Sequence, residues 1–171
     1  MKKTQIEIER KFIIERPSLE LLSTLDGYTE SDIVQTYLSS EMRVTHRIRA
    51  RSFRGVTVYT ETKKTRVDKL SAIEEEREID KVEYERLASL IAEGTRPIIK
   101  KRITLPHGKW LLEIDIYPEW TRTAILEVEL ASREEKPTFP DFIRVLTEVT
   151  GDKRYSNAGM SRAFPEEINY L

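Results

Sequence analysis

The stretch IEIERKF, residues 6–12, places Glu7, Glu9 and Lys11 two residues apart along the chain. Successive side chains of a β-strand point to opposite faces, so these three charges share one face and the isoleucines share the other. Six later stretches repeat the arrangement: HRIRARS (46–52), YTETK (59–63), IEEEREI (73–79), IIKKRIT (98–104), LLEIDIY (111–117) and ILEVELA (125–131). The pattern predicts strands with one ionic and one apolar face.

Alternation with period two, together with enrichment in Ile, Val, Thr or Tyr, predicts eight strands. They span residues 4–14, 33–39, 43–53, 56–64, 72–79, 98–105, 110–117 and 124–131. Short links at 54–55 and 106–108 are typical of hairpins between antiparallel neighbours. We expect an α+β, mainly β fold, in which an eight-stranded antiparallel β-barrel forms a tunnel with a charged interior and helices packed on the outside.

Four helices are expected between and after the strands. The first covers residues 17–26, and the second covers 80–93, where Glu83 completes a capping box. A third opens at Pro140, with apolar residues at 142, 145, 146 and 149 on one side. Ser156 is expected to cap a short fourth helix.

The length of 171 residues suits one domain over 1–171. The 29 Lys plus Arg nearly balance 30 Asp plus Glu, so no net field favours nucleic acid or a membrane as a partner. The absence of cysteine excludes disulfides and thiolate metal sites. Because the N-terminal stretch lacks the apolar segment of a secretion signal, and no apolar run has membrane-spanning length, we expect a cytoplasmic protein.

The charged faces would ordinarily turn outward to solvent, as in most sheets. Two features favour the opposite arrangement here. Most strands carry charges of a single sign, whereas a solvated face usually mixes them. In addition, amphipathic helices need an apolar outer surface, which the opposite strand faces supply through Ile6, Ile8, Ile48, Ile79, Ile114, Ile116, Val128 and Leu130. Because burying so many ions in a dry interior would be costly, the tunnel is expected to hold water and ligand.

The charged side chains indicate which kind of ligand the tunnel would bind. Rows of Arg and Lys match a ligand with several negative charges, and the guanidinium fork suits phosphate oxygens. Rows of Glu and Asp would repel that ligand unless a divalent cation lay between them. Carboxylate oxygens, without cysteine or a histidine pair, favour Mg²⁺ or Mn²⁺.

In this order along the chain, Glu7-x-Glu9-x-Lys11, Arg47-x-Arg49, Lys63, Glu74-x-Glu76, Lys100-x-Arg102, Asp115 and Glu127-x-Glu129 resemble the motifs of the CYTH superfamily, the triphosphate tunnel metalloenzymes. The resemblance covers nearly the whole chain and implies an eight-stranded tunnel that binds a linear triphosphate and divalent metal. The length and the segment VQTYL (34–38) resemble the compact bacterial type, which is associated with tripolyphosphatase activity. That activity releases phosphate and pyrophosphate from inorganic tripolyphosphate.

The resemblance assigns roles by position. Lys11, Arg47, Arg49, Lys63, Lys100 and Arg102 would bind the triphosphate, and Glu7, Glu9, Glu127 and Glu129 would hold one metal ion. Glu74, Glu76, Glu113 and Asp115 would hold a second metal ion or orient the attacking water, so Glu76 is a catalytic candidate. Lys63 and Tyr37 are expected to assist attack or departure at the terminal phosphoryl group, although Tyr37 would equally suit a packing role at the tunnel rim.

Several alternatives stay open from the sequence. Arg49 and Arg51 would replace Arg47 and Arg49 as the phosphate contacts in another hairpin register. Glu61, on the same face as Lys63, would weaken catalysis by pairing with Lys63 or with a nearby arginine. The activity would otherwise be that of a class IV type adenylyl cyclase or of a thiamine or nucleoside triphosphatase. A polyphosphate- or nucleotide-binding module is the non-enzymatic alternative, and the assembly is expected to be a monomer or homodimer.

Overall fold

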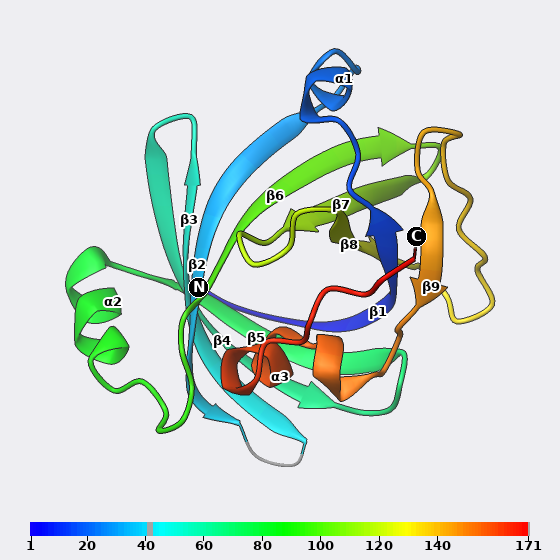
Figure 1. The fold of residues 1–171 in the computed structure, drawn as a ribbon. Helices are drawn as coiled ribbons and strands as arrows, with labels where there is room; N and C mark the ends of the chain where they lie inside the picture. Colours follow the sequence, from blue (N-terminus) through cyan, green and yellow to red (C-terminus); the bar gives the residue numbers. More distant parts are fainter. Residues whose placement is uncertain (41–42, 171) are drawn as a thin grey trace.

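A computed structural model describes residues 1–40 and 43–170, with the side chain of residue 40 excepted. Figure 1 shows strands curving around a central axis, with short helices beside them. The strands are β1 (Lys2–Glu15), β2 (Thr29–Ser40), β3 (Val44–Phe53), β4 (Val56–Arg66), β5 (Ser71–Ile79), β6 (Ile98–His107), β7 (Trp110–Ile116), β8 (Thr123–Glu129) and β9 (Val145–Glu148). The helices are α1 (Leu19–Ser23), α2 (Lys81–Ala88) and α3 (Asn157–Arg162), and a 3-10 turn, η1, covers Lys153–Tyr155.

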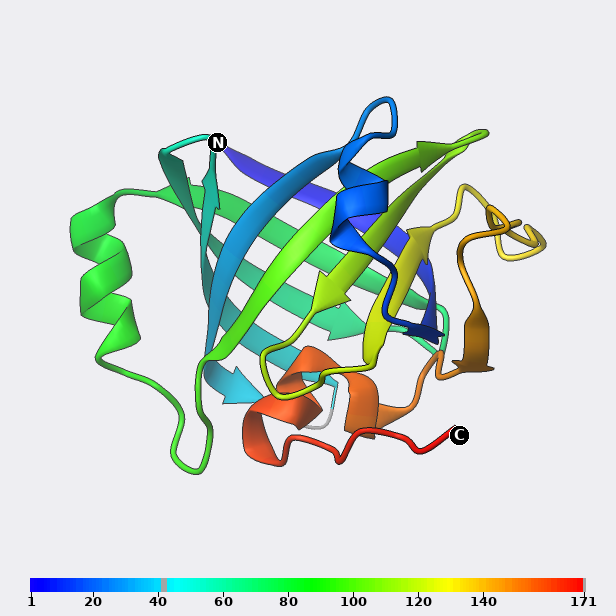
Figure 2. The same ribbon diagram turned by 45° about the horizontal axis from the view of Figure 1, so that its top comes forward.

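The barrel is antiparallel and closed, as the alternating pattern predicts. Neighbours follow the order β5-β4-β3-β2-β6-β7-β8-β1, and β1 also pairs with β5. The first half of β1 pairs with β5, from Lys2 opposite Arg77 to Ile8 opposite Ser71, and the second half pairs with β8. One long strand therefore joins both ends of the sheet, and Figure 2 shows β1 crossing behind the barrel to do so.

The predicted helix at Pro140 is wrong, because residues 145–148 form β9 against the second half of β1. Val149 N donates to Lys11 O at 2.8 Å and continues this edge pairing. The apolar residues of the segment pack in different directions: Phe142 lies against one apolar cluster and Leu146 against another. A strand accommodates that divergence, since alternate side chains point to opposite faces.

The other predicted helices are present but shorter, and each begins at an N-cap side chain. Ser18 Oγ accepts from Leu21 N at 3.2 Å, and Asp80 Oδ1 accepts from Glu83 N at 2.8 Å. Ser156 Oγ accepts from Gly159 N at 3.0 Å and starts α3. None of the helices in the described ranges is both long and apolar enough to cross a membrane.

Apolar side chains cover most of the outer barrel wall. Leu22 of α1 and Ile143 pack over Phe12, Leu112 and Leu126, while Leu87 of α2 packs over Ile48 and Ile79. The expected outer face is thus largely buried, with one exception. Ile6 is 70% exposed and opposes Ile73, so this part of the β1 and β5 surface is uncovered.

Helix α3 lies across one end of the barrel, whereas α1 and α2 lie beside its outer wall (Figure 1). Met160 is fully buried and packs in a cluster with Tyr37, Ile98, Tyr117 and Trp120. Polar and small residues of α3, among them Asn157 and Gly159, line the central cavity. The C-terminal segment therefore shapes one end of the site.

Candidate functional site: a charged cavity through the barrel

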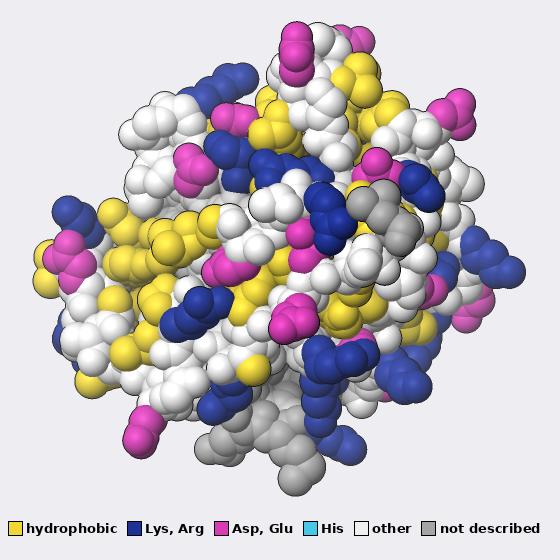
Figure 3. Space-filling model, viewed as in Figure 1, with side chains coloured by type: hydrophobic (Ala, Val, Ile, Leu, Met, Phe, Trp, Pro, Cys, Tyr) yellow, Lys and Arg dark blue, Asp and Glu magenta, His cyan; other side chains and the backbone are white. Residues whose placement is uncertain are grey.

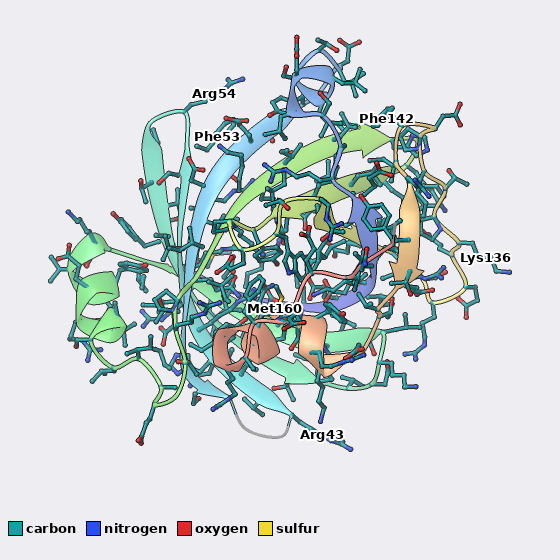
Figure 4. All side chains as sticks on the ribbon, in the orientation of Figure 1. Arg43, Phe53, Arg54, Lys136, Phe142 and Met160 are labelled. Carbon is teal, nitrogen blue, oxygen red and sulfur yellow. The ribbon has the colours of Figure 1, made fainter. Side chains whose placement is uncertain are left out.

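A cavity of about 570 Å³ occupies the barrel interior, and its walls are ionic. Eight strands contribute inward side chains: each of β1 to β8 places charged or polar residues on the cavity wall, with Glu113 coming from β7. Figure 4 shows the side chains of these strands converging inside the barrel, with Met160 of α3 at one end. The structure therefore turns the predicted ionic face inward.

Arg47, Arg49 and Arg51 all line the cavity, so β3 presents a continuous basic row. They lie opposite Tyr37, Gln35 and Ile33 of β2, and these side chains share the inward face. Burial lowers the pKa of Arg49, and the nearby positive charge of Arg47 lowers it further. Because all three guanidinium groups face inward, the structure leaves both phosphate-contact pairs available.

The positive charge of Arg47 is stabilised by its neighbours in the cavity wall. Burial opposes its charge, but Tyr37, Glu74 and Glu7 outweigh burial and raise the pKa of Arg47. Its Nη2 lies 3.6 Å from Glu74 Oε2, while its buried Nε has no hydrogen-bond partner among the described residues. A buried donor without a partner is costly, so this position is suited to an incoming acceptor such as a phosphate oxygen.

The placement of Lys63 on the inner face is wrong. Lys63 is exposed and absent from the cavity wall, whereas Lys64 lines it. The register explains the difference: inward Arg47 pairs with Thr62, so inward positions of β4 are Thr62, Lys64 and Arg66. Lys64 therefore occupies the position expected of Lys63.

Glu61 shares the outer face with Lys63, as the spacing predicts, and so it does not enter the cavity. It accepts from His46 Nε2 at 2.7 Å and pairs with Arg77. The expected interference of Glu61 with catalysis is therefore wrong, because its partners lie on the outside of the barrel.

Asp115 is fully buried beneath two cations rather than exposed in the cavity. Lys100 Nζ donates to Asp115 Oδ2 at 2.6 Å, and Arg102 donates to both Asp115 oxygens at 2.7 Å. Both oxygens are occupied, and Asp115 is absent from the cavity wall. Its predicted role as a metal ligand is therefore replaced by that of an anchor for Lys100 and Arg102.

Three carboxylates therefore hold Arg102, since its guanidinium also donates to Glu113 Oε2 at 2.7 Å and to Glu127 Oε2 at 2.8 Å. Glu127 in turn accepts from Lys11 Nζ at 2.9 Å. Burial opposes its charge, but Lys11 and Arg102 outweigh burial and hold the pKa of Glu127 well below its usual range. Glu113 and Glu127 line the cavity while already engaged by cations.

A second acidic group lies toward the other side of β1 and consists of Glu7, Glu9, Glu74 and Glu129. Glu9 of β1 lies directly opposite Glu129 of the neighbouring strand β8. Burial and the negative charges of Glu7, Glu9 and Glu74 raise the pKa of Glu129. Lys64 contacts Glu7 and lies 3.7 Å from both Glu9 and Glu74. These four carboxylates thus share a region that already attracts a cation.

Divalent metal fits this acidic group by its chemistry. Among residues 1–40 and 43–170, no three acidic or histidine side chains are arranged to hold a metal ion as they stand. The donors are nevertheless all carboxylate oxygens, the ligands that Mg²⁺ and Mn²⁺ prefer. Burial, and then the negative charges of Glu7, Glu9 and Glu74, raise the pKa of Glu129. Glu7, Glu9 and Glu129 are the residues that would hold such an ion.

Tyr37 is 3% exposed and lies against the cavity wall between Gln35 and Arg47. Its hydroxyl accepts from Gln35 Nε2 at 2.6 Å, and its ring packs in the cluster around Trp120. Tyr37 therefore combines the packing position and the inward hydroxyl that the two interpretations of the sequence separately required. Glu76 lies nearby on the wall, where its Oε2 accepts from Thr62 Oγ1 at 2.9 Å and lies 3.3 Å from Arg49.

Besides Lys64, the sequence interpretation omitted four basic residues of the cavity wall: Arg43, Arg66, Lys153 and Arg162. Arg43 continues the inward parity of Arg47, so counting by two along the predicted strand 43–53 would have found it, whereas Arg66 follows from Lys64 only once the register of β4 is known. Lys153 and Arg162 had no such signal, because η1 and α3 reach the cavity only through tertiary packing.

A second hollow of about 660 Å³ opens at the other end of the barrel and shares Arg49, Arg51 and Glu76 with the central cavity. Its remaining wall includes Met1, Phe53, Val56 and Val58. The two ends therefore differ: this one is largely apolar, and the end near η1 is basic.

A closed antiparallel barrel whose central cavity is lined by cations and carboxylates is the architecture that the resemblance to the triphosphate tunnel metalloenzymes implies. No family model and no curated protein matches the chain. Among solved structures, the inorganic triphosphatase NE1496 is 28% identical, covers 93% of this chain and 96% of its own, and has a TM-score of 0.59.

Two further structures show the same fold at lower identity. The PH1819 protein from Pyrococcus horikoshii OT3 is 20% identical over 75% of this chain and 80% of its own, with a TM-score of 0.57. HpAC1 from Hippeastrum, described as having a dominant triphosphatase activity, is 14% identical over 74% and 81%, with a TM-score of 0.50. These two neighbours show the fold alone, and the likeness to NE1496 agrees with the resemblance of the sequence to the CYTH superfamily.

Proposed function

We propose that this protein hydrolyses a linear triphosphate in a divalent-metal-dependent reaction, with inorganic tripolyphosphate as the substrate and phosphate and pyrophosphate as products. The observation that carries the proposal is that Arg47, Arg49 and Lys64 face the same cavity as Glu7, Glu9 and Glu129. Polyanion binding and metal binding are thereby combined in one enclosed space. The likeness to the inorganic triphosphatase NE1496 supports the same activity.

The cavity cations would bind the phosphate oxygens. Arg47, Arg49 and Arg102 offer guanidinium forks, and Lys11, Lys64 and Lys100 offer ammonium groups. Phosphoryl transfer depends mainly on positioning and on stabilising the charge that develops. A protein without a cysteine or serine–histidine nucleophile can therefore catalyse it.

The ion pairs of the free protein give a reason for binding substrate and metal together. Lys64 is held by Glu7, Glu9 and Glu74, and Arg47 and Arg49 lie beside Glu74 and Glu76. When a triphosphate takes these cations, the carboxylates lose their partners, and an unpaired buried charge is strongly unfavourable. A divalent ion held by Glu7, Glu9 and Glu129 would restore the balance and would supply charge neutralisation at the phosphates. Each ligand should therefore strengthen binding of the other.

The same cavity geometry suggests roles for three residues near the phosphoryl group that is transferred. Lys64, rather than Lys63, would stabilise charge on the transferred phosphoryl group. Tyr37 would hold Arg47 in place and offer its hydroxyl to a phosphate oxygen. Glu76, held by Thr62 and Arg49, would orient the attacking water.

A phosphate-release panel tests the proposal. The purified protein is incubated with tripolyphosphate, thiamine triphosphate, ATP or GTP, with Mg²⁺, with Mn²⁺ and with chelator. We expect the highest kcat/KM with tripolyphosphate and loss of activity with chelator. Cyclic AMP from ATP without phosphate release would instead identify a cyclase, and tight tripolyphosphate binding without any hydrolysis would identify a binding module.

A further inference from the structure

The end of the cavity near η1 carries a group of basic side chains that the proposed triphosphate chemistry leaves unused. This basic collar consists of Arg43 beside β3, Arg66 at the end of β4, Lys153 of η1 and Arg162 of α3, all on the cavity wall. Figure 4 places Arg43 at the edge of the barrel, below α3, and Figure 3 shows Lys and Arg side chains gathered along this lower edge.

The collar differs from the inner cavity in its charge balance. In the inner cavity, Lys11, Lys64, Lys100 and Arg102 each contact at least one carboxylate within 3 Å. In the collar, Arg66 donates to the backbone oxygens of Asp68 and Lys69, at 3.2 and 3.3 Å. Arg43 and Lys153 form no ion pair with any residue in the described ranges. The neighbouring Asp152 is engaged by Arg154 at 2.7 Å. Three members of the collar, Arg43, Arg66 and Lys153, thus carry positive charge without an ion-pair partner among the described residues.

The distance along the strand separates the collar from the triphosphate position. Arg43 lies four residues from Arg47 on the same inward face, about 13 Å at the usual rise of a strand. A triphosphate centred on Arg47 and Arg49 leaves the collar without a phosphate. A ligand that reaches both groups must carry further negative charges along its length.

The chemistry of this end favours phosphates over an organic group. Around Lys153 and Arg162, the described cavity wall of the C-terminal segment consists of small or polar residues without an aromatic side chain, namely Ser156, Asn157, Ala158 and Gly159, whereas Phe53, Val56 and Val58 lie at the opposite end. Recognition of a base usually uses an aromatic face, which the collar does not offer. Arginine and lysine are suited to repeated phosphate groups.

We propose that the basic collar is a subsite for the additional phosphates of linear polyphosphate chains longer than tripolyphosphate. The proposal rests on the proposed function, because it assumes that the first phosphates lie among the inner cations. It extends the substrate class from a single triphosphate to longer chains that emerge from the cavity beside η1.

The test compares two probes, tripolyphosphate and long-chain inorganic polyphosphate of defined length. Arg43 and Lys153 are both exposed, so the double variant Arg43→Ala/Lys153→Ala is expected to fold, which thermal unfolding checks. The control is Lys63→Ala/Lys101→Ala, which removes two positive charges from outside the cavity. Calorimetry with chelator present measures Kd without turnover, and phosphate release with Mg²⁺ measures hydrolysis.

We expect the wild type to bind the long chain more tightly than tripolyphosphate. The collar variant should raise Kd for the long chain by at least about tenfold, as loss of charge-assisted hydrogen bonds implies, and Kd for tripolyphosphate by less than about threefold. The control variant should leave Kd unchanged for both the long chain and tripolyphosphate. Equal weakening of both probes, or no change in either, would overturn the collar proposal.

Failure of the collar and failure of the proposed function give different results. If the protein hydrolyses tripolyphosphate but the collar variant changes Kd equally for the two probes, the result contradicts the collar proposal alone. A protein that hydrolyses neither probe, yet loses long-chain affinity in the collar variant, supports the collar and contradicts the triphosphatase. Equal competition by a single-stranded oligonucleotide for the long-chain site would also overturn the collar as a polyphosphate subsite.

Discussion

Arg102 of β6 and Asp115 of β7 lie directly opposite each other and share two hydrogen bonds of 2.7 Å, from Nε to Oδ1 and from Nη2 to Oδ2. Lys100 donates to the same carboxylate. Asp115 thus fixes two cations from below, and both of them line the cavity. A carboxylate that no ligand can reach therefore determines where ligand-binding groups stand.

Asp115→Asn should destabilise the protein by about 3–5 kcal/mol, because it leaves two buried cations without their shared anion. Denaturant unfolding monitored by circular dichroism measures the change. Glu75→Gln is the matched control, since Glu75 forms a partly exposed pair with Lys2 and should cost at most about 1 kcal/mol. Equal effects of the two substitutions would contradict the anchoring role.

Lys64→Ala should reduce kcat for tripolyphosphate by about 10²–10³-fold, the usual loss when one preorganised charge-stabilising group is removed. Lys63→Ala provides an unusually close control, because the two lysines are adjacent but point to opposite faces of β4. It should leave kcat within about twofold of the wild type. Steady-state phosphate release measures both, and a larger loss from Lys63→Ala would show that the register of β4 is wrong.

Burial lowers the pKa of Lys100 to about 8, despite the opposing charge of Asp115. As pH rises above about 8, the free enzyme loses the Lys100 ammonium charge, and kcat/KM for tripolyphosphate should fall. Lys100→Arg keeps the charge and should move this decline to higher pH. Lys101→Ala should retain the wild-type profile, because Lys101 pairs on the outside with Glu30 and Asp32. An unchanged profile in Lys100→Arg would remove Lys100 as the titrating group.

Glu9→Gln should raise the Mn²⁺ concentration needed for half-maximal activity by at least about tenfold, because the charge of the ligand set controls affinity for hard cations. Glu75→Gln again serves as the control, since Glu75 lies outside the acidic group of Glu7, Glu9, Glu74 and Glu129. Metal titrations at saturating tripolyphosphate measure the effect. A reduced kcat with an unchanged metal requirement would place Glu9 outside the metal site.

The sequence predicted the strands and the direction of the ionic face because both depend on an alternation that is local and repeated. Lys63 and Lys64 could not be separated in this way. The segment from Thr60 to Arg66 is polar on both faces, so its parity depends on Thr62 pairing with Arg47 across the sheet. That pairing exists only in the folded sheet and cannot be read from the local sequence.

The sequence also could not predict how deeply an inward side chain is buried. Asp115 was correctly placed on the inward face, but whether a carboxylate faces solvent or lies beneath cations depends on the neighbouring strand. The residues around Val145 show a third limit, since their apolar spacing fits a helix and a strand alike, and the free edge of β1 decided between them. Lys153 reached the cavity only because Met160 packs at the end of the barrel.

A crystal structure of the protein with tripolyphosphate and Mn²⁺ tests the central claim most directly, because anomalous scattering locates manganese independently of the phosphates. We predict phosphate oxygens within hydrogen-bond distance of Arg47, Arg49 and Lys64, and a manganese peak beside Glu7, Glu9 and Glu129. A triphosphate bound on the outer surface, with the Arg47–Glu74 and Lys64–Glu7 pairs intact, would contradict it.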